Sequence, residues 1–92
     1  MKIIAVCGSG LATSFMVAMN IRQVLSELKI TGVEVGHAEL DAVTADSADV
    51  FFLTKDIAPK GKHLGKVVEL ESIINLDELR EKVIETMKDY SK

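Results

Sequence analysis

Apolar runs and helical periodicity alternate along this chain. Residues 3–6 and 50–53 are uninterrupted apolar runs, which are typical of strands covered on both faces of a parallel sheet. Residues 33–38 alternate between apolar and polar, and this alternation predicts a half-exposed strand at a sheet edge. Residues 66–70 predict a short strand that follows the others. The pattern therefore predicts four strands, with the two apolar runs in the centre of the sheet.

Two further segments have the 3.6-residue period of amphipathic helices. The first predicted helix extends from about Thr13 to Leu28, and the second begins after Asn75. Asn75 is the expected N-cap, and Glu78 is its expected capping-box partner. The apolar stripe of the first helix consists of Val17, Ile21, Val24, Leu25 and Leu28. The stripe of the second helix consists of Leu76, Leu79, Val83, Met87 and Tyr90.

The other connections have weaker patterns. Residues 40–48 predict one or two helical turns, with Asp41 as their cap. Residues 54–62 hold Pro59 and Gly61, and their composition predicts a loop.

Strands that alternate with helices imply right-handed crossovers and a parallel sheet. We therefore predict an α/β fold with three layers, in which a four-stranded parallel sheet of order 2-1-3-4 is flanked by helices on both faces. One domain is expected to occupy residues 1–92, because a chain of this length has room for one core. Ligands of such sheets bind at the carboxyl ends of the strands where the winding reverses. The loop after Val6 lies at that point.

Composition and charge narrow the classes of function. The net charge is −3, with 11 Lys and Arg against 14 Asp and Glu, which argues against nucleic-acid binding because that binding depends on phosphate neutralisation. The single cysteine excludes an intramolecular disulfide and a cysteine-rich zinc site. No apolar stretch approaches the length of a membrane span or a signal peptide. These features predict a cytoplasmic domain.

The segment from Cys7 to Ser14 carries the candidate chemistry. Its glycines allow the backbone to curl so that several N–H groups converge, and the following helix adds its own N–H groups and the positive end of its dipole. The phosphate-binding residues expected here are Gly8, Ser9, Gly10, Leu11, Ala12, Thr13 and Ser14. The same groups should lower the pKa of the Cys7 thiol, because they stabilise the thiolate. Cys7 is therefore the candidate nucleophile.

Three functions that use a glycine-containing loop between a strand and a helix can be compared with this segment. A dinucleotide fingerprint would need a third glycine where Thr13 stands, and it would need a longer chain. A cysteine phosphatase has the loop Cys-x5-Arg, but the residue six positions after Cys7 is Thr13, so no guanidinium holds the transition-state charge. A phosphoryl carrier needs a cradle of N–H and hydroxyl groups without a group that promotes hydrolysis, and this segment fits that need. An anion-binding regulatory module, in which Cys7 is never phosphorylated, remains a non-enzymatic alternative.

The same residues resemble a known family. The sequence from Cys7 to Ser14, one short strand from the first residue, is similar to the phosphocysteine loop of the EIIB components of the bacterial sugar phosphotransferase system (PTS). The Ala-Thr-Ser ending, followed by Met16, Ala18 and Ile21, is most similar to the galactitol-type branch, and the ascorbate type is its near relative. Only about the first twenty residues carry a specific pattern.

This resemblance implies a phosphotransferase with a phosphocysteine intermediate on Cys7 and a cradle over residues 8–14. The implied donor is a phosphohistidine on the EIIA protein, and the implied acceptor is a sugar or polyol bound in the membrane permease EIIC. The resemblance implies no metal and no bound cofactor. It also implies no direct membrane insertion, so that contact with the membrane would be through EIIC.

A few residues outside the loop are weaker candidates. His37 and His63 lack a ligand cluster in the sequence, so surface or strand-end positions are expected for them. The loop from Thr54 to His63 is expected to rise at the same edge as Cys7, where its lysines Lys55, Lys60 and Lys62 could meet an acidic partner. Phe15 and Met16, with Met19 nearby, fit either an apolar docking patch or the core.

Overall fold

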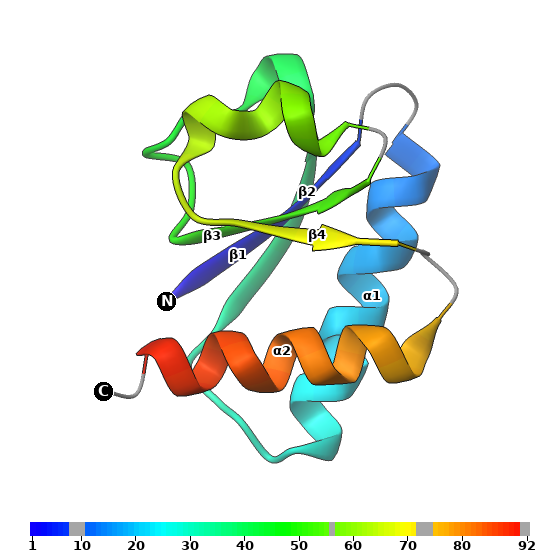
Figure 1. The fold of residues 1–92 in the computed structure, drawn as a ribbon. Helices are drawn as coiled ribbons and strands as arrows, with labels where there is room; N and C mark the ends of the chain where they lie inside the picture. Colours follow the sequence, from blue (N-terminus) through cyan, green and yellow to red (C-terminus); the bar gives the residue numbers. More distant parts are fainter. Residues whose placement is uncertain (8–10, 56, 72–74, 91–92) are drawn as a thin grey trace.

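The computed structural model describes residues 1–7, 11–55, 57–71 and 75–90 (Figure 1). The strands are β1 (Lys2–Cys7), β2 (Glu34–Glu39), β3 (Val50–Thr54) and β4 (Val67–Leu70). The α-helices are α1 (Leu11–Glu27) and α2 (Leu76–Tyr90), and two short 3-10 helices are η1 (Leu40–Ala42) and η2 (Ala58–Leu64). Neither α-helix of the described chain is long and apolar enough to cross a lipid bilayer.

The four strands form one parallel sheet in the order β2-β1-β3-β4. This order confirms the predicted topology, including the edge position of the alternating strand β2. In the register, Val6 lies opposite Leu53 of β3 and Cys7 lies opposite Glu39 of β2. The carboxyl ends of β1, β2 and β3 therefore meet at one edge of the sheet, as expected where the winding reverses.

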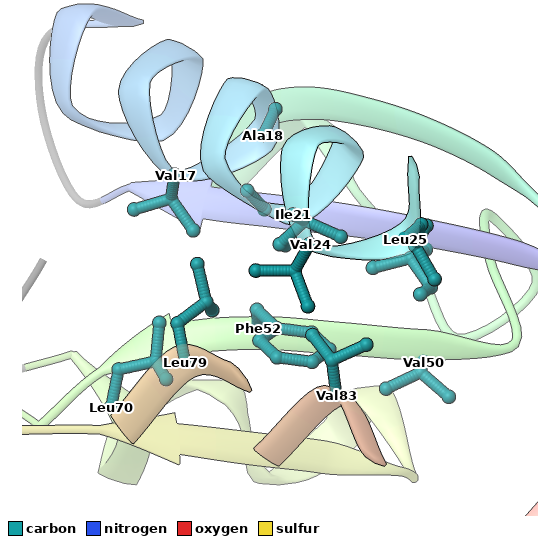
Figure 2. Close-up of a cluster of buried hydrophobic side chains, with 12 residues drawn as sticks. Val17, Ala18, Ile21, Val24, Leu25, Val50, Phe52, Leu70, Leu79 and Val83 are labelled. Carbon is teal, nitrogen blue, oxygen red and sulfur yellow. The ribbon is translucent and has the colours of Figure 1, made fainter. Parts of the chain in front are cut away.

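Both α-helices pack on the same face of the sheet (Figures 1 and 2). In Figure 2, side chains of α1 and α2 converge on Phe52 of β3, and Ile21 and Val83 are fully buried in this cluster. The predicted stripe of α1 is confirmed, because Val17, Ile21, Val24 and Leu25 are buried and Leu28 packs against them. Burying such side chains contributes on the order of 1.5–3 kcal/mol each, so this cluster fixes α1 against the sheet.

The opposite face of the sheet is covered by short elements instead of long helices. Ile57, Ala58 and Leu64, in and beside η2, pack with Val43 against the second face of β1 and β3. The expected loop over residues 54–62 is therefore wrong in part, since η2 begins at Ala58. The N-cap of η1 is Glu39, so Asp41 lies inside that helix and is not its cap. A right-handed connection that moves from β2 past β1 to β3 must cross the opposite face, and the residues available there are too few for a long helix.

The start of α2 has the predicted N-cap, whereas the Glu78 carboxylate, expected as the capping-box partner, binds a backbone N–H further back in the chain. The Asn75 Oδ1 accepts a hydrogen bond of 3.0 Å from the Glu78 N–H, which confirms Asn75 as the N-cap. The Glu78 carboxylate accepts hydrogen bonds of 3.1 Å from the backbone N–H of Glu71, just after β4. Leu79 and Val83 are buried and Met87 packs on the core, but Leu76 is 40% exposed, so its place in the stripe is wrong. The Tyr90 side chain lies outside the described part of the structure.

The far end of α1 closes with a tight turn. Lys29 has φ 58°, and its N–H donates to the Ser26 carbonyl at 3.1 Å, while the Ile30 N–H donates to the Leu25 carbonyl at 2.9 Å. These two bonds are those of a Schellman motif, in which the residue with positive φ is usually glycine. Here the position holds a lysine.

The open edge of the sheet at β2 is touched by an arginine from α1. The Glu34 N–H donates to the Met1 carbonyl at 3.0 Å, so the next residue, Val35, directs its carbonyl away from β1 because these directions alternate along a strand. The Arg22 Nη2 donates to this carbonyl at 2.6 Å. The Arg22 guanidinium therefore binds a backbone carbonyl of the edge strand β2 that points away from the sheet.

Candidate active site

The candidate site lies where β1 ends and α1 begins. Cys7 is the last residue of β1, and α1 starts at Leu11, so only residues 8–10 connect the two elements. Gly8, Ser9 and Gly10 lie outside the described residues. The only cysteine of the chain thus stands at the carboxyl end of a central strand, directly before a helix.

The helix starts earlier than the sequence predicts. Leu11, Ala12, Thr13 and Ser14 form the first turn of α1, whereas the prediction began the helix at about Thr13. The first N–H groups of a helix have no partner within it and carry the positive end of its dipole. The first turn of α1 contains no acidic residue that would compete for them. This backbone is suited to hold an anion at the end of β1.

The segment after β3 contributes one lysine to this edge. The Lys55 N–H donates to the Leu70 carbonyl at 2.8 Å, which places Lys55 just beyond the carboxyl ends of β3 and β4. The chain then returns over the second face of the sheet, where Gly61 of η2 packs on Leu53, and it reaches Lys66 beside the start of β3. The expected rise of the whole segment beside Cys7 is therefore wrong, because η2 folds back over the sheet.

The two histidines lie on different elements. His37 is exposed on β2, and its ring meets the Phe15 ring edge to face, with centroids 5.4 Å apart and an interplanar angle of 88°. His63 is exposed near the end of η2. Within the described part of the chain, no three His, Cys, Asp or Glu side chains gather closely enough to hold a metal ion.

The structure distinguishes between the two interpretations of the first turns of α1. Phe15, Met16 and Met19 are 47%, 46% and 51% exposed, so they are not core residues. Glu39 of β2, which is not among the residues predicted for the site, is the register partner of Cys7. Nothing in the local sequence indicates that pairing, because it depends on the register of two strands that are distant in the chain.

Comparisons with known proteins agree with this geometry. Several solved structures have the same fold: the lactose-specific IIB component domain of the PTS from Streptococcus pneumoniae aligns with a TM-score of 0.67 at 15% identity, covering 98% of this chain and 97% of that one. A low molecular weight protein tyrosine phosphatase from Bacillus subtilis aligns with a TM-score of 0.62 at 18% identity, covering 99% and 97%. A mutant of YwlE from Bacillus subtilis aligns with a TM-score of 0.63 at 20% identity, covering 100% and 99%.

At these identities the solved structures establish the fold alone. No curated protein sequence matches the chain. The family model of the PTS system, Lactose/Cellobiose specific IIB subunit, matches residues 2–88, nearly the whole chain. With its cysteine at the end of the first strand of this fold, the chain belongs to the PTS lactose/cellobiose-specific IIB subunit family.

Proposed function

We propose that this protein relays a phosphoryl group through Cys7 in a sugar phosphotransferase system. The donor is the phosphohistidine of an EIIA protein, and the acceptor is a sugar or polyol bound by a membrane EIIC permease. The observation that carries this proposal is the position of the single cysteine, at the end of β1 and four residues before the start of α1. Membership of the IIB family supports the same role.

The mechanism consists of two displacements at phosphorus. The Cys7 thiolate attacks the phosphorus atom, an S–P bond forms, and the P–N bond to the donor histidine breaks, which returns the electron pair to the imidazole. The sugar hydroxyl then attacks the same phosphorus, the S–P bond breaks, and the thiolate is regenerated while the hydroxyl proton passes to a base on the acceptor side. In each step, backbone N–H groups from Gly8 to Ser14 would stabilise the negative charge on the phosphoryl oxygens. Ser9, Thr13 and Ser14 would add hydroxyl donors.

The branch of the family is part of the proposal. The family model describes lactose and cellobiose specificity, whereas the loop ending Ala12-Thr13-Ser14 resembles the galactitol type. We therefore propose a galactitol-like donor pairing within this family. A protein of this kind would act in the cytoplasm and approach the membrane through its permease.

The test is the intact mass of the protein after incubation with phosphoenolpyruvate, the two general PTS proteins and a panel of EIIA proteins of the lactose, cellobiose, galactitol and ascorbate types. We expect a gain of one phosphoryl group that maps to Cys7, and the EIIA with the highest kcat/KM identifies the branch. Cys7→Ala should abolish the gain. Alanine is the better control than serine, because an arginine phosphatase variant of this fold holds a phosphoryl group on its active-site serine. No gain with any EIIA would contradict the relay.

A slow cysteine phosphatase is the second candidate, because solved phosphatases share the fold. The sequence disfavours it, since Thr13 stands where the phosphatase loop has its arginine. Steady turnover of an aryl phosphate that is lost in Cys7→Ala would favour this candidate. Phosphate binding without any covalent product would instead favour an anion-binding module.

A further inference from the structure

A hollow lies between the last turns of α1 and the edge strand β2. Its volume is about 400 Å³, which is within the range of pockets that hold small molecules. The helix begins at Leu11, directly after the end of β1, and the first helical residue that lines the hollow is Arg22. A rise of about 1.5 Å per residue puts these two residues roughly 16 Å apart along the helix axis. The hollow is therefore separate from the candidate active site (Figure 1).

The least exposed residues that line the hollow are apolar. They are Leu25, Ile30, Val33 and Val35. Leu25 is buried, and the other three are half-buried and pack against the main core. We call these four residues the floor of the hollow. The apolar body of a ligand would remove their remaining exposed area from water, which is favourable.

The exposed residues that line the hollow are basic or carry hydroxyl groups. They are Arg22, Ser26, Lys29 and Thr31. The first three are spaced i, i+4 and i+7, so they follow one side of the helix. No Asp or Glu of the described chain lines the hollow, although the whole chain has a net charge of −3. The local excess of two positive charges favours an anionic ligand.

Arg22 is held in place at one end of the hollow. Its Nη2 donates to the Val35 carbonyl at 2.6 Å. A guanidinium has five N–H donors in one plane, so a bond to one carbonyl leaves donors that can bind a carboxylate. Because the carbonyl orients the guanidinium before a ligand arrives, less side-chain entropy is lost on binding.

Lys29 lines the hollow in a backbone conformation that glycine usually adopts. Its φ is 58°, and such a conformation costs stability in any residue with a Cβ. Residues in costly conformations cluster at ligand sites. The end of a helix carries partial negative charge, but the carbonyls of Leu25 and Ser26 accept hydrogen bonds from the N–H groups of Ile30 and Lys29. These bonds reduce the repulsion of an anion, and the Lys29 ammonium attracts it.

We propose that the hollow binds a small organic acid, whose carboxylate pairs with Arg22 and Lys29 and whose apolar body covers the floor. Inorganic phosphate would leave the floor exposed, and a sugar phosphate would place hydroxyl groups on it. A neutral apolar molecule would leave the two cations without a counter-charge. The site is independent of the phosphoryl relay, so this inference goes beyond the proposed function.

The test is a titration of the ¹⁵N-labelled protein with hexanoate, followed by the NMR signals of the backbone N–H groups. We expect saturable shifts confined to residues 22–35, with a Kd on the order of 5 mM for a ligand of this size. 1-Hexanol has the same chain without the charge, and inorganic phosphate has charge without the chain. Each should bind at least about threefold more weakly. Binding of hexanoate should weaken between roughly 20 and 300 mM salt, because salt screens surface charges.

Substitutions of Lys29 test the contribution of charge. Lys29 is a better target than Arg22, because Arg22 also contacts the edge of the sheet. Lys29→Gln should raise the Kd for hexanoate about threefold to fivefold. Lys29→Gly should raise it similarly in a protein that folds at least as well, because glycine is favoured at a positive φ. Lys60→Gln is the matched control, because it removes the same charge from an exposed position of η2.

The outcomes separate a specific site from general attraction of the ligand. Saturable shifts at residues 22–35 that both Lys29 variants weaken and Lys60→Gln does not would establish the site. Shifts spread over the surface, or equal binding of hexanoate and 1-hexanol, would overturn the proposal. Phosphate that binds as tightly as hexanoate would also overturn it, since the floor would then contribute nothing. An unchanged Kd in both Lys29 variants would show that the carboxylate is held elsewhere.

Discussion

At the scale of single residues, two backbone positions carry constraints that the sequence pattern does not show. Lys29 has a positive φ in the turn after α1, although glycine is the usual residue in this conformation. Gly61 of η2 lies so close to β3 that a Cβ atom there would overlap the Leu53 Cδ2 methyl. Asn75 shows the opposite case, since its cap was predictable from a local signal and is confirmed.

Replacement of Lys29 by glycine should stabilise the protein. A side chain in the left-handed region costs about 1 kcal/mol through the contact of its Cβ with the backbone, and glycine removes that contact while making the unfolded chain more flexible. We expect Lys29→Gly to raise the free energy of unfolding by about 0.5 kcal/mol, measured by urea denaturation. Lys29→Ala removes the same charge but keeps the Cβ. An equal gain in both variants would show that charge and not conformation is responsible.

Replacement of Gly61 by alanine should destabilise the protein. The added methyl group must displace the buried side chain of Leu53, and such overpacking costs about 1–3 kcal/mol. Gly36→Ala is the matched control, because no heavy atom lies within 4 Å of a Cβ built at that position in β2. The urea midpoint of Gly61→Ala should fall while that of Gly36→Ala stays near the wild type. Equal midpoints in the two variants would contradict the close approach of η2 to the sheet.

At the scale of elements, regular patterns could be predicted and contacts between elements could not. The alternation of residues 33–38 predicted the edge position of β2, because a half-exposed strand has apolar residues on its buried side and polar residues on its solvent side. η2 was missed because its proline and glycine are typical of loops, while its order comes from packing of Ala58 and Leu64 on the sheet. Leu76, the first residue of α2, follows the stripe but is exposed, whereas Leu79, three residues later, is buried in the core.

The N-terminal cap of α2 is expected to contribute measurably to stability. Asn75→Ala removes the side-chain acceptor of the Glu78 N–H and should lower the free energy of unfolding by about 1 kcal/mol. Asn75→Asp keeps an acceptor at the same position and should lose much less. Thermal or urea unfolding followed by circular dichroism measures both, and a similar loss in the two variants would show that the cap is not the cause.

At the scale of the whole molecule, the strand order was predictable but the distribution of helices over the two faces was not. The apolar runs of β1 and β3 require other residues to cover both faces of the sheet. Helices α1 and α2 cover one face, and η1, η2 and their flanking residues cover the other. The asymmetry follows from the handedness of the crossovers and the length of each connection. The position of Cys7 at the end of β1 was predictable from the sequence, whereas the returning course of η2 was not.

The contact of Arg22 with the Val35 carbonyl bears on how copies of the molecule behave toward one another. A parallel sheet has two open edges, and an exposed edge strand is a template on which strands of other molecules can add. β2 is the longer edge strand, with six residues against four in β4. A guanidinium on an outward carbonyl of β2 blocks such pairing and places a positive charge where a second strand would approach.

We therefore expect Arg22 to oppose aggregation more than it opposes unfolding. Arg22→Met should leave the urea midpoint nearly unchanged and accelerate the growth of light scattering on storage at high concentration. Arg80→Met is the matched control, because it removes the same charge from α2, where Arg80 contacts Glu27 instead of a strand edge. Equal scattering from both variants would attribute the effect to net charge. Faster scattering from Arg22→Met alone would show that a single hydrogen bond at the edge of the sheet keeps a concentrated solution of this protein free of intermolecular β-structure.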